Sequence, residues 1–349
     1  MSLDTLAKVD LFCYADGAIR PETLARWIGR GPDQREPMVS ETARLAKVEK
    51  TEQIAEKRQW LRSLLTGPDD LTDAMADLAR HYIAEVVVHV ELVIDLPTLQ
   101  LPGMTVTQVI QALDAGCELA VTERDDVFLS RMLLVEIPCD YTGDQALALV
   151  EELIANDPPN LGGIVLADDP QGRPLERFGP ALDRAAAADL GRVAVVGDRR
   201  DAARVLQAVD LGVQRIVGGT VALQKDDLLT SLRARRIPIV ALPTAQVLSG
   251  VARNWQAHPI RKMKEAGLFT VVGSGWPTWL GMTLSEELEQ VSRHQHWRLD
   301  DLRNLTTRAI EAAFMSPVLR FQLARTVEVW RHRPLVQAQA KNGGDPWSM

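Results

Sequence analysis

The sequence of 349 residues is poor in cysteine and has no excess of basic residues. Its three cysteines, Cys13, Cys117 and Cys139, are unevenly spaced and form no Cys-x-x-Cys pair. We therefore expect no disulfide framework and a reducing, cytoplasmic location. The 39 Lys and Arg residues are outnumbered by 47 Asp and Glu residues, which gives a formal net charge of −8. A nucleic-acid-binding surface needs clustered positive charge, so we expect no nucleic-acid partner.

The sequence also lacks an uninterrupted apolar run that could cross a membrane. Its longest apolar segment, residues 83–96, is broken by Glu85, His89 and Glu91. A spanning helix needs about 20 predominantly apolar residues. The first residues do not show the basic start and apolar stretch of a signal peptide. We therefore expect neither a membrane segment nor a signal peptide.

What the chain does have is a repeated alternation of short β-branched runs and helical patterns. This alternation is typical of βα units and a parallel sheet. Eight such runs lie near residues 9–14, 83–90, 132–138, 163–167, 192–197, 214–218, 237–242 and 268–274. Eight units predict the α/β fold class and, within it, a single (β/α)₈ barrel with functional residues at the carboxyl ends of its strands.

We expect the barrel to span residues 1–336. The first connection, residues 22–82, is longer than one crossover helix needs, which predicts extra helices inserted after the first strand, on the face that carries barrel active sites. The stretch Thr283-Leu-Ser-Glu286 has the spacing of a capping box and predicts the start of a later helix. The polar residues 337–349 are expected to form a disordered tail.

One segment near the N-terminus carries a family resemblance. Residues 11–21 read Leu-Phe-Cys-Tyr-Ala-Asp-Gly-Ala-Ile-Arg-Pro. They resemble the first-strand motif of the adenosine and adenine deaminases, zinc hydrolases of the amidohydrolase superfamily, which runs Leu-His-x-His-Leu-Asp-Gly-Ala-Ile-Arg-Pro. By this resemblance, Phe12 and Tyr14 stand where the family has two zinc-binding histidines.

The C-terminal part of the chain resembles the same family. Residues 258–277 are similar to the deaminase segment that begins His-Pro-Ile and ends Asn-Thr-Asp-Asp-Pro. Gly275 and Trp276 stand at its two aspartate positions, and the first of these binds zinc in the family. Residues 300–314 resemble the family's C-terminal helix motif.

Two strands between these segments also match the family pattern without its reactive side chains. Residues 192–198 are similar to the segment that ends His-Ala-Gly-Glu, with Val195 for a metal histidine and Asp198 for the catalytic glutamate. Residues 215–219 resemble Arg-Ile-Gly-His-Gly, with Gly218 for the histidine that would steady the attacking water.

The resemblance therefore implies a family member whose metal ligands have been replaced. A catalytic zinc needs about three protein ligands and an open position for water. Zinc lowers the pKa of that water from about 15.7 to about 7, so its loss forfeits about 12 kcal/mol of help in forming hydroxide. The histidines do not rebuild a site, because His294 and His296 are two apart on a predicted helix and face different sides. We expect a zinc-free pseudoenzyme with no cofactor and no deaminase activity.

Six residues at the expected barrel mouth are candidates for binding a ligand: Tyr14, Asp16, Gly17, Asp168, Asp198 and Trp276. By the resemblance, Asp16 would contact the ribose hydroxyls of a nucleoside, although it could equally cap the turn after the first strand. Tyr14 and Trp276 either stack on a base or fill the space that the metal would occupy.

Two functions are consistent with this sequence. The first is non-catalytic: the chain binds a purine or nucleoside, or it serves as a structural or regulatory subunit, paired with an active deaminase relative or with itself. The alternative is an enzyme with a rebuilt, metal-independent or Mg²⁺-dependent site made of Asp16, Asp168 and Asp198, acting on a purine-like or other small substrate, with Asp198 as the candidate catalytic residue.

Overall fold

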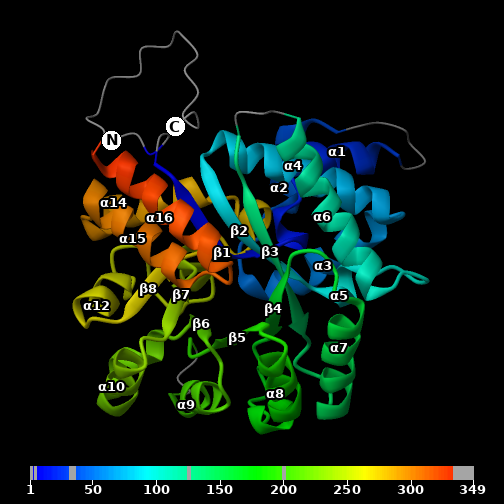
Figure 1. Ribbon diagram of the computed structural model, residues 1–349. Helices are drawn as coiled ribbons and strands as arrows, with labels where there is room; N and C mark the ends of the chain where they lie inside the picture. The colour runs from blue at the N-terminus through cyan, green and yellow to red at the C-terminus, as the bar shows by residue number, and fades with distance from the viewer. Residues whose placement is uncertain (1–2, 4–5, 31–36, 124–126, 199–201, 333–349) are drawn as a thin grey trace.

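A ring of parallel strands forms the centre of the molecule (Figure 1). The computed structural model describes residues 3, 6–30, 37–123, 127–198 and 202–332. Within them, the strands are β1 (Lys8–Tyr14), β2 (Val87–Ile94), β3 (Ser130–Ile137), β4 (Leu161–Leu166), β5 (Gly191–Val196), β6 (Arg215–Gly218), β7 (Pro238–Ala241) and β8 (Phe269–Val272). Each strand pairs in parallel with the next one along the chain. A bridge between Cys13 and Gly275 joins the end of this sheet to β1, so the barrel is nearly closed.

Helices surround this ring because the strands have apolar side chains on both faces. Every residue of β1 and β2 is buried. The helices of eight or more residues are α1 (Pro21–Gly29), α2 (Val39–Ala46), α3 (Ile54–Leu64), α4 (Pro68–Ala84), α6 (Val106–Thr122), α7 (Gly143–Asn156), α8 (Gly179–Ala187), α9 (Ala202–Asp210), α10 (Asp226–Ala234), α14 (Leu284–Gln295), α15 (Leu299–Ala312) and α16 (Pro317–His332). The predicted (β/α)₈ barrel is therefore confirmed.

Helices of fewer than eight residues lie in the connections that follow the strands. They are η1 (Asp16–Ala18), η2 (Thr51–Gln53), α5 (Leu96–Leu99), η3 (Leu175–Phe178), η4 (Thr220–Gln224), α11 (Pro243–Leu248), α12 (Ile260–Glu265) and α13 (Pro277–Leu280). Helices α1 to α4 follow β1 directly, as the long first connection predicts. The expected tail, residues 337–349, lies outside the described residues.

The structure corrects the position of the second strand. The sequence pattern predicts a strand near residues 83–90, but Ile83 and Ala84 end α4, and β2 begins at Val87. Between them Val86 adopts a left-handed conformation with φ of 58° and ends the helical run. Of the polar residues that interrupt the apolar pattern, Glu85 caps the end of α4, whereas His89 and Glu91 lie inside β2 and bind Ser130 and Arg215.

Other local predictions hold. Thr283 and Glu286 form the capping box at the start of α14, with Thr283 N donating to Glu286 Oε2 over 2.8 Å. Among the described residues, no helix is both long and apolar enough to cross a bilayer.

A buried ion pair crosses the barrel interior. Arg215 and Glu91 are both fully buried, and Arg215 Nη2 lies 3.1 Å from Glu91 Oε1. Arg215 also donates to the carbonyl oxygens of Leu11 and Ala312, at 3.2 and 2.6 Å. Burial acts to raise the pKa of Glu91, but the charge of Arg215 and the hydrogen bonds from His89 and Arg215 together outweigh it and lower that pKa. The pair thus ties β1, β2, β6 and the end of α15 together.

We predict that Arg215→Leu destabilises the fold by about 3–5 kcal/mol, because it leaves Glu91 as an unpaired buried charge. The matched control is Arg235→Leu, which removes an exposed pair with Asp210 and should cost less than about 1 kcal/mol. Urea unfolding of both variants measures the difference. Replacing both Glu91 and Arg215 by leucine should recover part of the loss, and equal effects of the two single variants would contradict this account.

Glu287 is a second buried carboxyl, and it has no basic partner among the described residues. It lies in α14, fully buried, and accepts a hydrogen bond from Thr244 N at 3.3 Å. Burial raises its pKa to about 8, and the nearby charge of Asp10 acts in the same direction. The folded protein therefore binds this proton at a pH where the unfolded chain has released it.

Glu287 should make the protein less stable as pH rises from about 5 to 8, by up to about 1.4 kcal/mol per pH unit. The contribution is fully present below the unfolded pKa of 4.5 and is lost as pH passes the folded value of about 8. Glu287→Gln should flatten the pH dependence of the unfolding free energy over this range. Glu289→Gln, an exposed change in the same helix, should leave the slope of the wild type, and parallel curves for all three proteins would refute the prediction.

Candidate functional site

The candidate site is the mouth of the barrel, where the carboxyl ends of the strands meet. Seven side chains at or just beyond strand ends gather here: Tyr14, Asp95, Glu136, Asp168, Asp198, Gln246 and Trp276. Helix α3, from the inserted helices, contributes Arg58. These residues form two groups, one beside β1 to β3 and the other beside β4 to β8.

An aromatic stack separates the two groups. The ring of Tyr14 lies flat against the indole of Trp276, with ring centres 4.5 Å apart and an angle of 5° between the planes. Phe12 meets Tyr14 edge-on at 5.2 Å and is fully buried. A Cβ atom at Gly17 would lie only 2.4 Å from Trp276, so the indole rests directly on the backbone of this glycine. These rings fill the interior between β1 and β8 with apolar atoms.

Beside β1 to β3, one guanidinium is held by three carboxylates. Arg58 Nε lies 2.8 Å from Asp16 Oδ2, and its Nη1 lies 2.5 Å from Asp95 Oδ2 and 3.9 Å from Glu136 Oε1. The hydroxyl of Tyr14 donates a hydrogen bond to Glu136. The guanidinium also lies over the Tyr14 ring at 5.2 Å. We call Arg58, Asp16, Asp95 and Glu136 the arginine cluster.

The electrostatics of the arginine cluster follow from burial and from an excess of acid. The Asp16 side chain is fully buried, and burial raises its pKa to about 6 although Arg58 opposes the shift. Burial raises the pKa of Glu136 to about 7 against the same opposition. Burial and the charge of Glu136 raise the pKa of Tyr14, so its hydroxyl keeps the proton that it donates. Asp16 Oδ1 and Arg58 Nη2 are buried without a hydrogen-bond partner among the described residues.

Beside β4 to β8, the mouth contains a cavity of about 270 Å³. Its walls are mostly apolar, with Val195, Val217 and Leu242 among them, and Trp276 forms part of the boundary. Its polar lining includes Thr51, Asp168, Asp198 and Gln246. The Thr51 hydroxyl and the Trp276 indole nitrogen are buried and have no hydrogen-bond partner in the described part of the chain. We call this space the mouth cavity.

Asp198 is held in place in the mouth cavity by a chain of hydrogen bonds. Gln246 Nε2 donates to both carboxylate oxygens, at 2.8 and 3.0 Å, and the Thr220 hydroxyl donates at 3.0 Å. His258 Nε2 lies 2.9 Å from Gln246 Oε1, while His258 Nδ1 accepts from the Ile260 backbone at 3.2 Å. Burial lowers the pKa of His258 to about 4, so the ring is neutral and donates through Nε2.

The hydrogen bond from His258 to Gln246 Oε1 orients the Gln246 amide so that its NH₂ group faces Asp198. Burial raises the pKa of Asp198 despite these donors, and the charge of Asp168 acts in the same direction. Gly218 next to it has φ of 100°, and a Cβ atom there would lie 2.9 Å from Asp198 Cγ. The carboxylate therefore takes the space that a larger residue at position 218 would need.

The structure places the six candidate ligand residues at the mouth but divides them. Tyr14, Asp16 and Gly17 lie on the arginine-cluster side, Asp168 and Asp198 line the mouth cavity, and Trp276 lies between the two. The alternative carboxylate site needs Asp16 beside Asp168 and Asp198, and the structure does not bring them together. In the described part of the chain, no three His, Cys, Asp or Glu side chains form a group that could hold a metal.

Sequence reasoning missed four residues of this site. They are Arg58, Asp95, Glu136 and Gln246. Glu136 could have been found, because it is a carboxylate near the carboxyl end of a predicted barrel strand, whereas Asp95 lies beyond the predicted second strand and follows β2 only where the structure places it. Nothing in the local sequence separates Arg58 from the other charged residues of the inserted helices.

Comparison with known proteins agrees with this architecture. The sequence model of the adenosine deaminase family matches residues 7–330. The adenine deaminase of Rhodospirillum rubrum is 25% identical over 324 residues, which cover 92% of this chain and 96% of that protein. The aminodeoxyfutalosine deaminase of Streptomyces avermitilis is 25% identical over 335 residues, covering 93% and 91%.

Solved structures show the same fold. An adenine deaminase from Arthrobacter aurescens superimposes with a TM-score of 0.82 at 22% identity, covering 94% of this chain and all of the other. An amidohydrolase from Burkholderia ambifaria with bound zinc gives a TM-score of 0.82 at 24% identity, covering 94% and 91%. Since the family model spans almost the whole described barrel, this chain belongs to the adenosine deaminase family.

Proposed function

We propose that this chain is a zinc-independent member of the adenosine deaminase family that binds a purine-like small molecule in the mouth cavity without deaminating it. One observation carries the proposal. The positions that resemble the family's zinc ligands hold aromatic rings, an aliphatic side chain and a glycine, and one of these rings stacks on Trp276. The neighbouring carboxylates are already paired with Arg58.

The residues present do not fit a zinc ion. Phe12 and Val195 have no donor atom, and Gly275 has no side chain. The Tyr14 hydroxyl is committed to Glu136, and its ring is covered by Trp276. A catalytic zinc needs about three nitrogen, sulfur or oxygen ligands from the protein. We therefore derive no step of a reaction through a metal at these positions.

The mouth cavity nevertheless has the features of a small-molecule site. Such sites combine mostly apolar walls with a few placed polar groups. Asp198 supplies acceptors for N–H groups, and the unpartnered Trp276 N–H and Thr51 hydroxyl can pair with ring nitrogens. A heteroaromatic ring with both donors and acceptors matches this set, and adenine has both.

The size of the mouth cavity favours a base over a nucleoside. Its volume of about 270 Å³ is just below the range of about 300 to 1,000 Å³ that is usual for ligand sites. Asp16, which the family resemblance assigns to ribose, is bound by Arg58 and does not line the cavity. We therefore expect adenine to bind more tightly than adenosine.

The test measures binding and turnover on the same protein. In isothermal titration calorimetry adenine should saturate the protein, and incubation with adenine, adenosine and added Zn²⁺ should release no ammonia. Asp198→Asn removes a charge-assisted acceptor and should weaken adenine binding about tenfold or more. Asp73→Asn, an exposed change on α4, should leave the affinity unchanged.

Two results would contradict the proposal. Ammonia release that Asp198→Asn abolishes and Asp73→Asn does not would show that this chain catalyses deamination. If neither adenine nor adenosine bound, the purine ligand would be ruled out. The proposed partner would then be a protein, either an active relative or a second copy of this chain.

A further inference from the structure

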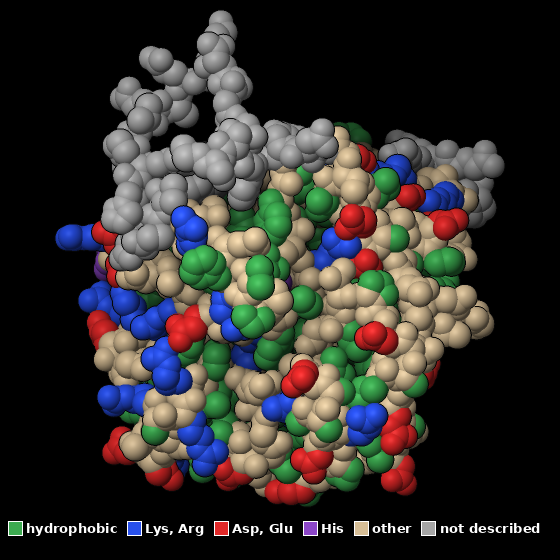
Figure 2. Space-filling view, in the orientation of Figure 1, with side chains coloured by type: hydrophobic (Ala, Val, Ile, Leu, Met, Phe, Trp, Pro, Cys, Tyr) green, Lys and Arg blue, Asp and Glu red, His purple; other side chains and the backbone are tan. Residues whose placement is uncertain are grey.

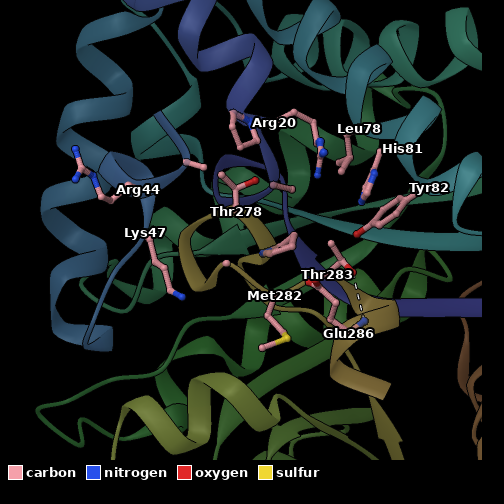
Figure 3. Close-up of a pocket in the computed structure, with 15 residues that line it drawn as sticks. Arg20, Arg44, Lys47, Leu78, His81, Tyr82, Thr278, Met282, Thr283 and Glu286 are labelled. Carbon is pink, nitrogen blue, oxygen red and sulfur yellow. Dashed lines mark hydrogen bonds between the residues drawn. The ribbon is translucent and has the colours of Figure 1, made fainter. Parts of the chain in front are cut away.

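A second cavity lies on the flank of the barrel, between the inserted helices and α13. It has a volume of about 320 Å³. Five segments line it: the start of α1, helix α2, the end of α4, helix α13 and the first turn of α14. Figure 3 shows its lining side chains, and we call it the flank crevice. It shares no lining residue with the mouth cavity.

The charged side chains that line the flank crevice are mostly basic, although the whole chain carries a net negative charge. Its lining includes Arg20, Arg44, Lys47 and His81 but only one acidic residue, Glu286. The Glu286 carboxylate is used in the capping box of α14, where it accepts from Thr283 N. On a chain with a net charge of −8, this local excess of cations is unusual. On the face seen in Figure 2, by contrast, basic side chains are interspersed with acidic ones.

The excess positive charge is concentrated at the α2 end of the flank crevice. At the other end, Arg20 lies 3.5 Å from Glu22, and His81 lies 3.3 Å from Glu85. Arg44 and Lys47 form no ion pair with any residue that the structure describes. In Figure 3 the Lys47 side chain extends toward Met282, whereas the Arg44 side chain lies at the outer edge of the crevice and points away from it.

Between these ends the flank crevice is apolar. Ala18, Pro21, Leu78, Pro277 and Met282 contribute to this part of the lining. An anion with an apolar body would therefore match the crevice better than an inorganic ion. The apolar part would be removed from water along the crevice while its charged group stays close to Lys47.

The wall that carries Lys47 is held in a fixed position. Val48 N donates to Trp279 O at 2.7 Å, which attaches the end of α2 to α13. The Lys47 side chain crosses Gly281 so closely that a Cβ atom at residue 281 would lie 3.1 Å from Lys47 Cδ. The crevice is thus present before any ligand binds, which lowers the cost of binding.

From these features we infer that the flank crevice is a binding site for a small amphipathic anion, a molecule with an apolar body and a carboxylate or phosphate group that pairs with Lys47, at the end of the crevice where Arg44 adds a second positive charge. The crevice also contacts two of the segments that form the barrel mouth. Ala18 ends the short helix that contains Asp16, and Pro277 follows Trp276 directly. An occupant would therefore rest against the outer side of the segments that hold the arginine cluster and the aromatic stack.

The test uses displacement of the fluorescent anion toluidinonaphthalene sulfonate from the whole protein. Hexanoate and hexyl phosphate should displace it, hexanol should do so weakly, and hexylamine should not. The ratio of the two anions distinguishes a carboxylate ligand from a phosphate ligand. In the double variant Arg44→Gln/Lys47→Met, each lost contact should weaken the anions about two- to fivefold, or about tenfold together. Methionine keeps an unbranched side chain over Gly281 that reaches as far as Lys47 Cε.

The matched control is Arg253→Gln/Lys225→Met, which removes the same charge from exposed positions outside the crevice. It should keep the wild-type affinity for both anions. Equal displacement by hexylamine and hexanoate would overturn the inference, because the site would not select negative charge. Equal affinities in the double variant and the control would also overturn it, because the anion would then bind elsewhere.

Discussion

The interaction between the Arg58 guanidinium and three carboxylates determines how the barrel mouth is arranged. Asp16, Asp95 and Glu136 follow or end three neighbouring strands, and Arg58 reaches them from an inserted helix. Buried carboxylates that close together would repel one another without a cation between them. Arg58 supplies that cation from the chain itself. The same contact holds α3 over the mouth and orients Glu136 to accept from Tyr14, which in turn supports Trp276.

The aromatic stack then limits what the rest of the mouth can do. Because Trp276 rests on both Tyr14 and the backbone of Gly17, the space beside β1 is filled. What stays open is the mouth cavity beside β4 to β8, where Gln246, Thr220 and the neutral His258 hold Asp198 in one orientation. In the function proposed above, this fixed carboxylate recognises a ligand and does not activate a metal-bound water.

The fold was predictable from sequence because barrel strands are short, apolar and separated by helices, so that periodicity locates them. The error at β2 has the same origin: His89 and Glu91 interrupt the pattern, although both are buried, and Glu91 is paired with Arg215. The mouth was predictable only in part. Tyr14, Asp168, Asp198 and Trp276 were found at strand ends, but the division of the mouth into two groups depends on ring packing and on the position of α3. Neither the ring packing nor the position of α3 follows from the spacing of residues in the sequence, so Arg58 could not be assigned to the site.

The central claim is that the chain's own side chains occupy the interior in which related barrels hold zinc. The most direct test is the zinc content of the full-length protein, purified from zinc-supplemented cells and measured by inductively coupled plasma mass spectrometry. The account predicts far less than one zinc per chain, with no change when Asp16 is replaced by asparagine. One tightly held zinc per chain would contradict it, because the ion would have to displace the aromatic stack or the arginine cluster.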